Sequence, residues 1–259
     1  MRITVFTSNQ ARHISLIENL ANICDELYCV QECNTIFPGS VEDFYKKTDI
    51  MQEYFGSVLN AEKKIFGKPS FLQKNIVSFS IKVGDLSLLD KESLSKCLQS
   101  DIYIVFGASY IKGWLAEYLT SKNTINIHMG VSPYYRGSSC NFWALYDENP
   151  SYVGATIHKL SKGLDNGPIL YHCLPKYKGE SVFEFTMNSV KIAHQSLIER
   201  ISSEEIFDIK PIEQDRSLEV RYTKNMDFTD KVASEFLQRA IILDKTSFNY
   251  PDLVNPYFG

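Results

Sequence analysis

The sequence predicts an α/β fold with a doubly wound, mostly parallel sheet, and three observations lead to this prediction. Residues 2–33 read as a strand, a helix and a strand, the unit from which such sheets are built. The stretch DIYIVFGAS at 101–109 is almost continuously apolar, as in a central strand that helices cover on both faces. Strand-like and helix-like segments then alternate to about residue 201. With 259 residues, 44% of them apolar, the chain can bury one sizeable core.

The first elements follow directly from the hydrophobic pattern. RITVFT at 2–7 is a short apolar strand, and ELYCVQEC at 26–33 returns to strand-like composition. Between them, apolar residues recur at the spacing of one helix face, namely Ile14, Ile17, Leu20, Ala21 and Ile23. Residues 35–75 break this rhythm with a loop and one or two amphipathic helices, which we interpret as a surface insertion.

The alternation resumes after the insertion. Strands are expected at 75–83, 101–109, 125–128, 154–160 and 168–174, and helices at 91–100, 111–119, about 141–148 and 180–201. We therefore expect a core domain over residues 1–203 and a small C-terminal extension over 204–259. The extension holds 7 basic and 11 acidic residues, which accounts for the whole formal charge of −4.

Charge and composition limit the partners and the compartment. A net charge of −4 and a pI near 5.8 give no general footprint for nucleic acid, so a small-molecule partner is expected. The start of the chain lacks the features of a signal peptide, and no run approaches the length of a membrane span. The six cysteines form no CxxC pair. These features predict a cytoplasmic, non-membrane protein without disulfides or a zinc site.

The stretch INIHMGVSPYYRG at 125–137 is where chemistry is expected. Residues two apart on a strand face the same side, so Asn126 and His128 project together from a strand end, where open α/β sheets bind ligands. An amide beside an imidazole can stabilise an oxyanion and move a proton. A lone histidine there is more often an ordinary sheet residue. Asp165, in the turn LDNGP, would raise the pKa of such an imidazole if the fold placed the two together.

Two motifs at this separation resemble the folate-dependent formyltransferases. They are Asn126-Ile127-His128 followed by Pro133-Tyr134-Tyr135-Arg136-Gly137, and Gly154-Ala155-Thr156-Ile157-His158 followed by Leu164-Asp165-Asn166-Gly167. The resemblance covers roughly residues 1–200. It implies a Rossmann-like core that transfers a formyl group from 10-formyltetrahydrofolate to a primary amine without a metal. It also implies that Asn126, His128 and Asp165 form the catalytic trio.

The same resemblance suggests the binding residues. It implies a folate site at the loops 107–112 and 161–164, which gives as cofactor-binding candidates Ser109, Tyr110, Lys112, Ser161, Gly163 and Leu164. The substrate-binding candidates are Ser8, Asn9, Arg12, Tyr135 and Arg136. Two departures stand out: the family often has Ser-Leu-Leu-Pro where this chain has Gly130-Val131-Ser132-Pro133. The first loop also lacks the glycines that cradle phosphate in the glycinamide ribonucleotide enzymes.

The acceptor is the least determined part of this prediction. The length of the chain and the stretch NFWAL at 141–145 resemble the sugar N-formyltransferases, which favours a nucleotide-linked amino sugar of surface glycan biosynthesis. Members of that group often form homodimers. The acidic C-terminal extension disfavours methionyl-tRNA, because a tRNA is held largely through its phosphates. Glycinamide ribonucleotide, a hydrolase that deformylates the same folate, and a non-catalytic folate- or nucleotide-binding module stay open as alternatives.

Overall fold

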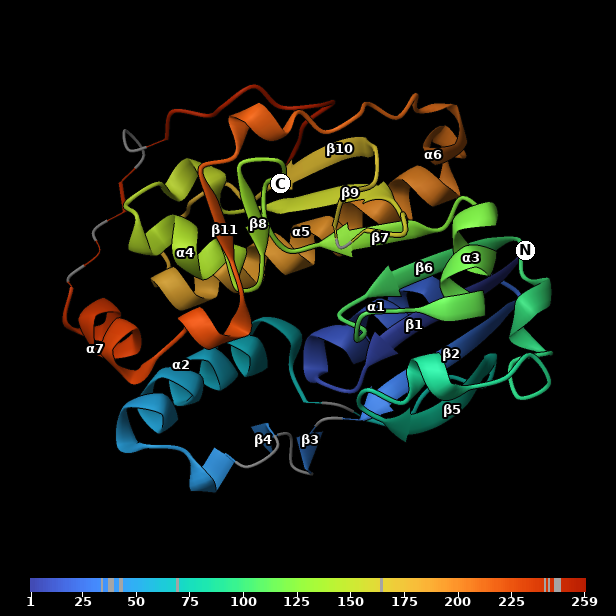
Figure 1. Cartoon of the computed structure of the whole chain (residues 1–259). Coiled ribbons are helices and arrows are strands. Elements are labelled where there is room, and N and C mark those ends of the chain that lie inside the picture. Colours follow the sequence, from blue (N-terminus) through green and yellow to red (C-terminus); the bar gives the residue numbers. More distant parts are fainter. Residues whose placement is uncertain are drawn as a thin grey trace.

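The computed structural model describes residues 1–33, 35–36, 40–41, 44–68, 70–163, 165–239, 241, 243–244 and 248–259. An eight-stranded sheet crosses the molecule (Figure 1). Its strands, from one edge to the other, are β12 (Tyr257–Phe258), β10 (Ile169–Leu174), β9 (Ala155–Lys159), β7 (Ile125–His128), β6 (Ile102–Phe106), β1 (Arg2–Ser8), β2 (Glu26–Cys33) and β5 (Ile76–Lys82).

The sheet is mostly parallel, which confirms the predicted fold class. β5, β2, β1, β6 and β7 run in one direction, and β10 pairs in parallel with β12. β9 runs antiparallel to both of its neighbours, β7 and β10. The parallel half is typical of α/β folds, in which crossover helices connect successive strands and cover both faces of the sheet.

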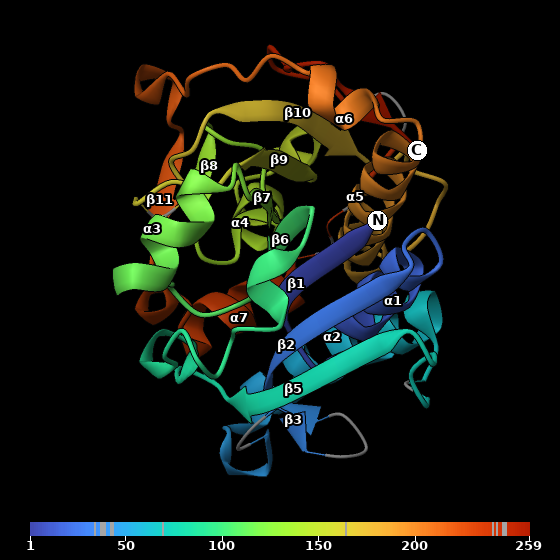
Figure 2. The ribbon, with the colours of Figure 1, turned by 90° about the vertical axis from the view of Figure 1, so that its right-hand side faces the viewer.

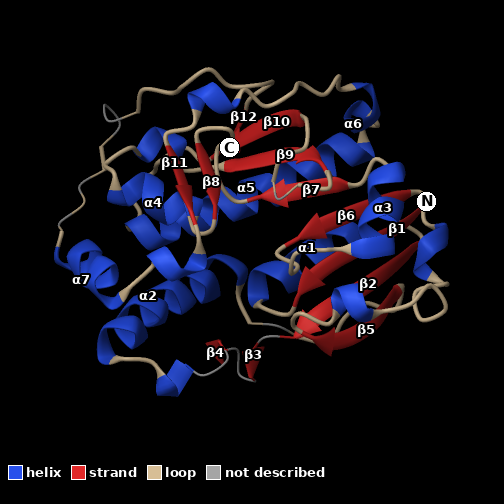
Figure 3. Cartoon of the chain, in the orientation of Figure 1, coloured by secondary structure: helices blue, strands red, loops and turns tan. Residues whose placement is uncertain are grey.

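Helices cover the two faces of this sheet (Figure 2). α1 (Ala11–Ala21) and α5 (Val182–Ser202) pack on one face, and α3 (Gly113–Ser121) lies on the other. The remaining helices are α2 (Asp49–Phe66), α4 (Cys140–Tyr146), α6 (Glu205–Asp208) and α7 (Asp230–Gln238). Two small ladders complete the strands shown in Figure 3: β3 (Thr35–Ile36) with β4 (Ser40–Val41), and β8 (Tyr135–Gly137) with β11 (Arg221–Thr223). None of the helices in the described ranges is long and apolar enough to cross a bilayer.

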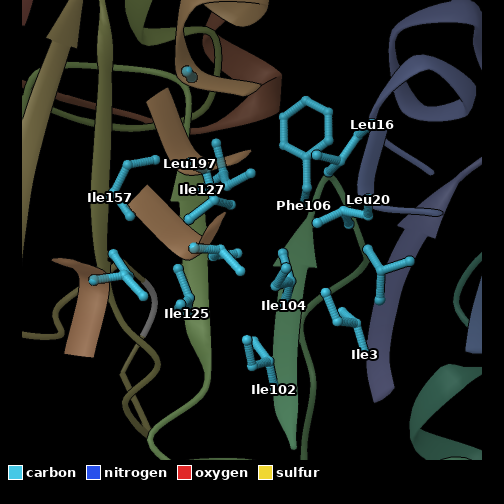
Figure 4. Close-up of a cluster of buried hydrophobic side chains, with 14 of the residues drawn as sticks. Ile3, Leu16, Leu20, Ile102, Ile104, Phe106, Ile125, Ile127, Ile157 and Leu197 are labelled. Atoms are coloured by element: carbon cyan, nitrogen blue, oxygen red, sulfur yellow. The ribbon is translucent and has the colours of Figure 1, made fainter. Parts of the chain in front are cut away.

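The core forms where β-branched side chains of neighbouring strands meet the helices on one face. Figure 4 shows the residues from the strands, Ile3, Ile102, Ile104, Phe106, Ile125, Ile127 and Ile157, beside Leu16, Leu20 and Leu197 from α1 and α5. Isoleucine packs well on a pleated surface, and its stiff side chain loses little freedom there. Because Ile127 belongs to this core, the side chains of Asn126 and His128 are directed to the opposite face of β7.

The helix expected at 91–100 is wrong, since the structure has turns there and only a 3₁₀ segment at Cys97–Gln99. The backbone there bonds between residues three apart, from the amide of Ser95 to the carbonyl of Glu92 (3.1 Å) and from the amide of Cys97 to the carbonyl of Leu94 (3.0 Å). Bonds of this span form turns and short 3₁₀ segments, and they bring the buried Leu94 and Cys97 to one side.

The segment expected as a surface insertion contributes to the interior. Tyr54 of α2 is 9% exposed, and its ring meets those of Phe142, Phe228 and Phe236 at centroid distances of 4.9–6.1 Å. α2 is amphipathic, and its apolar side packs against α5 and α7. Tyr54, Ala61 and Glu62 are the buried residues of α2 and its other side chains are half-buried or exposed, so the helix covers the core from outside. The interpretation of residues 35–75 as an insertion stays a prediction.

Strand pairing joins residues after 203 to the core. β11 pairs with β8 in parallel, β12 adds an edge strand beside β10, and Ile212 forms a β-bridge with Ile169. The chain boundary that we predict at residue 203 stays a prediction.

Candidate active site

The candidate site lies at the carboxyl end of β7, where the sequence places Asn126 and His128. In the β7–β9 pair, Asn126 is opposite His158 and His128 is opposite Thr156. Directly opposed residues of an antiparallel pair have neighbouring side chains, so the register itself brings His158 to Asn126. Both members of the Asn126–His128 pair are buried, with 8% and 7% of their surface exposed.

The amide of Asn126 is held from two sides. Its Nδ2 atom lies 2.9 Å from Nε2 of His158 and 3.3 Å from Oδ1 of Asp165. The other ring nitrogen of His158, Nδ1, lies 2.8 Å from the carbonyl of Lys159. Because a carbonyl only accepts, Nδ1 of His158 carries the proton and Nε2 accepts from Asn126. The sequence motif included His158 but gave it no role; its register opposite Asn126 is the signal that identifies one.

Asp165 and His128 form a buried ion pair. Nδ1 of His128 lies 3.3 Å from Oδ2 of Asp165. Burial alone favours the neutral imidazole, but the adjacent Asp165 carboxylate outweighs it and holds the pKa of His128 well above its usual value. Burial would likewise raise the pKa of Asp165, and His128 reverses this and keeps it well below the usual range. The three predicted catalytic residues are therefore brought together: the carboxylate of Asp165 contacts both the imidazolium of His128 and the amide of Asn126.

Cys140 contacts the second nitrogen of this histidine. Its Sγ atom lies 3.5 Å from Nε2 of His128 and 3.4 Å from the carbonyl of Gly137. The sequence pattern predicts no role for Cys140, since the six cysteines form no CxxC pair. Its place at the start of α4, immediately after the turn that follows Arg136, is decided by the tertiary structure.

The departure at Gly130-Val131-Ser132 now has a physical reason. A Cβ atom on Gly130 would lie 2.5 Å from Cβ of Cys140 and 2.9 Å from Nε2 of His128, so this position has no room for a side chain. Val131 and Ser132 are fully buried. The hydroxyl of Thr156 donates to the carbonyl of Gly130 (2.6 Å) and accepts from the amide of Ser132 (2.8 Å). The loop is thereby fixed to β9, directly beside His128.

The two loops expected to hold folate are brought together. The hydroxyl of Tyr110 donates to the carbonyl of Lys162 (2.8 Å), which links the loop after β6 to the loop after β9. Ser109 is bonded to the buried carboxylate of Glu32 through both its amide (2.5 Å) and its hydroxyl (2.7 Å). The Nζ atom of Lys112 lies 5.5 Å from the ring centroid of Tyr110.

In the second loop, the hydroxyl of Ser161 donates to the carbonyl of Gly163 (3.2 Å), while Leu164 lies outside the described residues. Glu32, which is not among the residues predicted from the sequence, also accepts from the amide of Gly84 (2.8 Å). Its position as the last but one residue of β2, at the carboxyl edge of the sheet, was the available signal.

Several residues expected to bind the acceptor are buried or bound to other protein groups. Ser8 is 1% exposed and its hydroxyl donates to the carbonyl of Glu32 (2.9 Å), with Asn9 following it in the same loop. Nη1 of Arg12 lies 3.0 Å from Oε1 of Glu62, a buried carboxylate of α2. Much of the positive charge expected for an anionic acceptor is therefore neutralised within the protein.

The two candidates on β8 also differ. Tyr135 is 1% exposed, and its hydroxyl accepts from Nδ2 of Asn149 (2.8 Å), so it packs in the interior. Arg136 reaches the catalytic turn instead: Nη2 donates to Oδ1 of Asn166, the neighbour of Asp165, and Nη1 lies 2.8 Å from Oε2 of Glu219.

A cavity of about 290 Å³ adjoins the site through Cys140. Its walls are mainly aromatic and aliphatic, and Tyr54, Phe142 and Phe228 contribute three of the rings. Arg12 and Met129, the residue after His128, line it as well. Across the described ranges, no group of three or more His, Cys, Asp or Glu side chains is arranged to hold a metal ion.

Comparisons with curated proteins give partial matches. The methionyl-tRNA formyltransferase of Lachnospira eligens is 32% identical over 140 residues, which are 49% of this chain and 43% of that protein. The mitochondrial formyltetrahydrofolate deformylase 2 of Arabidopsis thaliana is 24% identical over 141 residues, 51% of this chain and 41% of that protein. The aligned region thus spans less than half the length of either relative.

A solved structure matches almost the whole fold. The formyltransferase PseJ from Anoxybacillus kamchatkensis, solved with UDP-4,6-dideoxy-4-formamido-L-AltNAc and tetrahydrofolate, superposes with a TM-score of 0.52 at 15% identity. The alignment covers 93% of this chain and 94% of that one. At this identity the match shows a shared fold.

The family follows from a match that includes the site. A family model described as formyl transferase matches residues 57–201, more than half of the chain, and this range contains Asn126, His128 and Asp165. These three side chains meet in the structure at the end of one strand. The chain belongs to the formyl transferase family.

Proposed function

We propose that this protein transfers a formyl group from 10-formyltetrahydrofolate to the primary amine of a nucleotide-linked amino sugar. The observation that carries the proposal is the contact of Asp165 with both His128 (3.3 Å) and Asn126 (3.3 Å) at the carboxyl end of β7. This arrangement offers an amide and an imidazolium to a carbonyl oxygen, with a carboxylate that stabilises the imidazolium.

The residues act as follows in the proposed reaction. The amine attacks the formyl carbon, and negative charge grows on the carbonyl oxygen. His128 donates a hydrogen bond to that oxygen. Asn126 exchanges its longer bond, the one to Asp165, for a second bond to the oxygen. Removing one such donor typically costs about a hundredfold or more in rate. Asp165 then helps to pass the proton of the amine to the leaving folate nitrogen, and the C–N bond to folate breaks as the tetrahedral adduct collapses and the carbonyl forms again.

Folate binding is assigned to the two linked loops. Ser109, Tyr110 and Lys112 lie in the first loop, and Ser161 and Gly163 lie in the second. The bond between Tyr110 and Lys162 supports a single site made by both. Holding donor and acceptor together supplies a large share of the acceleration, without a covalent enzyme intermediate.

An amino sugar is the acceptor class that we favour. The acidic extension disfavours tRNA, which is held largely through its phosphates. The loop after β1 lacks the glycines that cradle phosphate in the glycinamide ribonucleotide enzymes. Cys140 and Met129 line a cavity next to His128, which gives an acceptor room beside the trio. The fold match to a formyltransferase solved with a nucleotide-linked formamido sugar supports the same class. A cytoplasmic location, a role in surface glycan synthesis and a homodimer stay predictions.

A mass-spectrometric panel tests the proposal. Purified protein with 10-formyltetrahydrofolate is given nucleotide-linked amino sugars, glycinamide ribonucleotide or methionyl-tRNA, and each product is examined for one added formyl group. We expect the gain with at least one amino sugar and its loss in His128→Ala. Formylation of methionyl-tRNA alone would contradict the acceptor class.

The match to a folate deformylase makes hydrolysis the second candidate. A water molecule in place of the amine would release formate from the same donor. Formate produced at the full rate without any amine would favour this activity over transfer.

A further inference from the structure

A glutamine from the C-terminal extension is bound to the catalytic turn. Nε2 of Gln214 donates to the carbonyl of Asp165 (2.8 Å) and to the carbonyl of Gly167 (2.8 Å). The segment that carries it is fastened to the sheet, since Ile212 and Ile169 exchange two backbone hydrogen bonds of 2.8 and 2.7 Å. One side-chain amide thereby spans the turn from residue 165 to residue 167.

The backbone of this turn needs such support. Asp165 has a φ of +48°, in the left-handed region that residues other than glycine adopt uncommonly. Gly167 has no room for a side chain, because a Cβ atom there would lie 1.6 Å from the carbonyl oxygen of Lys159. The turn therefore packs against Lys159 of β9 at Gly167, and its carbonyls at Asp165 and Gly167 accept hydrogen bonds from Gln214. A strained conformation persists only where surrounding contacts determine it.

The residue between these two carbonyls is held independently. Arg136 donates to the side chain of Asn166, and Glu219 binds the same guanidinium at 2.8 Å. Each of the three residues 165–167 is therefore bound by a side chain from outside the turn: Gln214, from the extension, binds residues 165 and 167, and Arg136 binds residue 166. Glu219, also from the extension, holds Arg136.

We propose that Gln214 is a positioning residue, which fixes the backbone of Asp165 so that its carboxylate meets His128. The proposal rests on the proposed function for its catalytic meaning. The amide is required for its N–H groups alone, because its Oε1 atom is buried without a hydrogen-bond partner in the described part of the chain. Glutamate at this position would place a carboxylate oxygen against two carbonyls, and methionine would fill the space without donating.

Kinetics and a titration of His128 test this role in the full-length protein. In Gln214→Met we expect kcat to fall by up to about a hundredfold, as misplacement of a reacting group by about 1 Å can cost that much. The KM values for folate and amine should stay close to those of the wild type. The histidine resonances of His128, followed by NMR without any substrate, should titrate at lower pH than in the wild type. Gln214→Glu should show the larger loss.

Gln52→Met is the matched control. Nε2 of Gln52 also donates to one backbone carbonyl, that of Lys47 (2.8 Å), but from α2. It should change neither kcat nor the titration of His128. A Gln214→Met protein that loses only thermal stability, with kcat and the His128 titration unchanged, would show a purely structural role and overturn the proposal. If the wild type transfers no formyl group, the proposed function fails, and the substrate-free titration still decides whether Gln214 positions Asp165.

Discussion

The Nδ1 atom of His128 lies 3.3 Å from Oδ2 of Asp165, although the two residues belong to different segments, the end of β7 and the turn after β9. The pair is buried and accounts for the direction of both pKa changes. The contact makes His128 a charged hydrogen-bond donor at neutral pH, as the proposed reaction requires. It also makes the activity depend on one carboxylate, and this dependence can be measured.

Asp165→Asn should remove the charge that keeps His128 protonated. Burial then favours the neutral imidazole, so the pKa of His128 should fall and the high-pH limb of the kcat profile should move to lower pH. At neutral pH we expect kcat to drop by about a hundredfold to ten-thousandfold, the usual contribution of a placed acid–base group. Asp147→Asn is the control, because that carboxylate binds Arg221 (2.6 Å) instead of a catalytic residue. An unshifted limb in Asp165→Asn would contradict this account.

Gly130→Ala should displace the catalytic imidazole. The new methyl group would lie within 2.9 Å of both Nε2 of His128 and Cβ of Cys140, so one of them must move. We expect at least about a tenfold loss of kcat, since small misplacements at a reacting centre are costly. Gly56→Ala in α2 meets no atom within 4 Å and should keep full activity. Steady-state kinetics on both proteins measure the difference. Equal kcat in the two variants would show that the loop at residues 130–132 moves to make room and that His128 keeps its position.

Tyr54→Ala should destabilise the protein because α2 is part of the core. The ring lies among Phe142, Phe228 and Phe236, and its removal leaves a large cavity. Truncation of a buried aromatic side chain typically costs about 3–5 kcal/mol in the free energy of unfolding. Phe71→Ala, at a side chain that is 99% exposed, should change it by less than about 0.5 kcal/mol. Urea denaturation compares the two, and similar midpoints would argue that α2 packs loosely.

His194→Phe should reduce the loss of stability in acid. His194 lies between the rings of Phe106 and Phe66, neither of its nitrogens has a partner in the described part of the chain, and burial lowers its pKa to about 3. In the unfolded chain His194 has the ordinary histidine pKa, about 6.5, so below that pH the unfolded chain binds one proton that the folded chain does not. The free energy of unfolding therefore falls as the pH decreases from about 6.5 toward 3.

The size of this effect follows from the linkage of one proton. The slope is about 1.4 kcal/mol per pH unit, so at pH 5 His194 accounts for about 2 kcal/mol of lost stability. Denaturant unfolding of wild type and variant at pH 5 and pH 8 measures it. Identical differences between the two pH values in both proteins would mean that His194 is protonated in the folded state.

The sequence alone was enough to predict the mostly parallel α/β fold class and the candidate residues Asn126, His128 and Asp165, whose catalytic roles stay predictions. These follow from short-range rules: alternation fixes which side of β7 carries Asn126 and His128, and apolar runs mark strands that are covered on both faces. The family motifs supplied Asp165. The helix expected at 91–100 is wrong, because the backbone there bonds between residues three apart and forms turns, which the apolar pattern does not distinguish from a helix.

Only the tertiary structure decided which distant groups complete the site. The strand register places His158 opposite Asn126, and the position of Cys140 leaves no room for a side chain at residue 130. Gln214 binds the turn of Asp165 although it lies forty-nine positions further along the chain. The sequence likewise suggested that Arg12 binds the substrate, whereas in the structure its guanidinium forms an ion pair with Glu62 of α2. Hydrogen bonds and ion pairs depend on distances of about 3 Å, and long-range packing sets those distances. Hydrophobic periodicity therefore predicts the strands that carry the site, whereas the side chains that orient it are decided when the elements pack together.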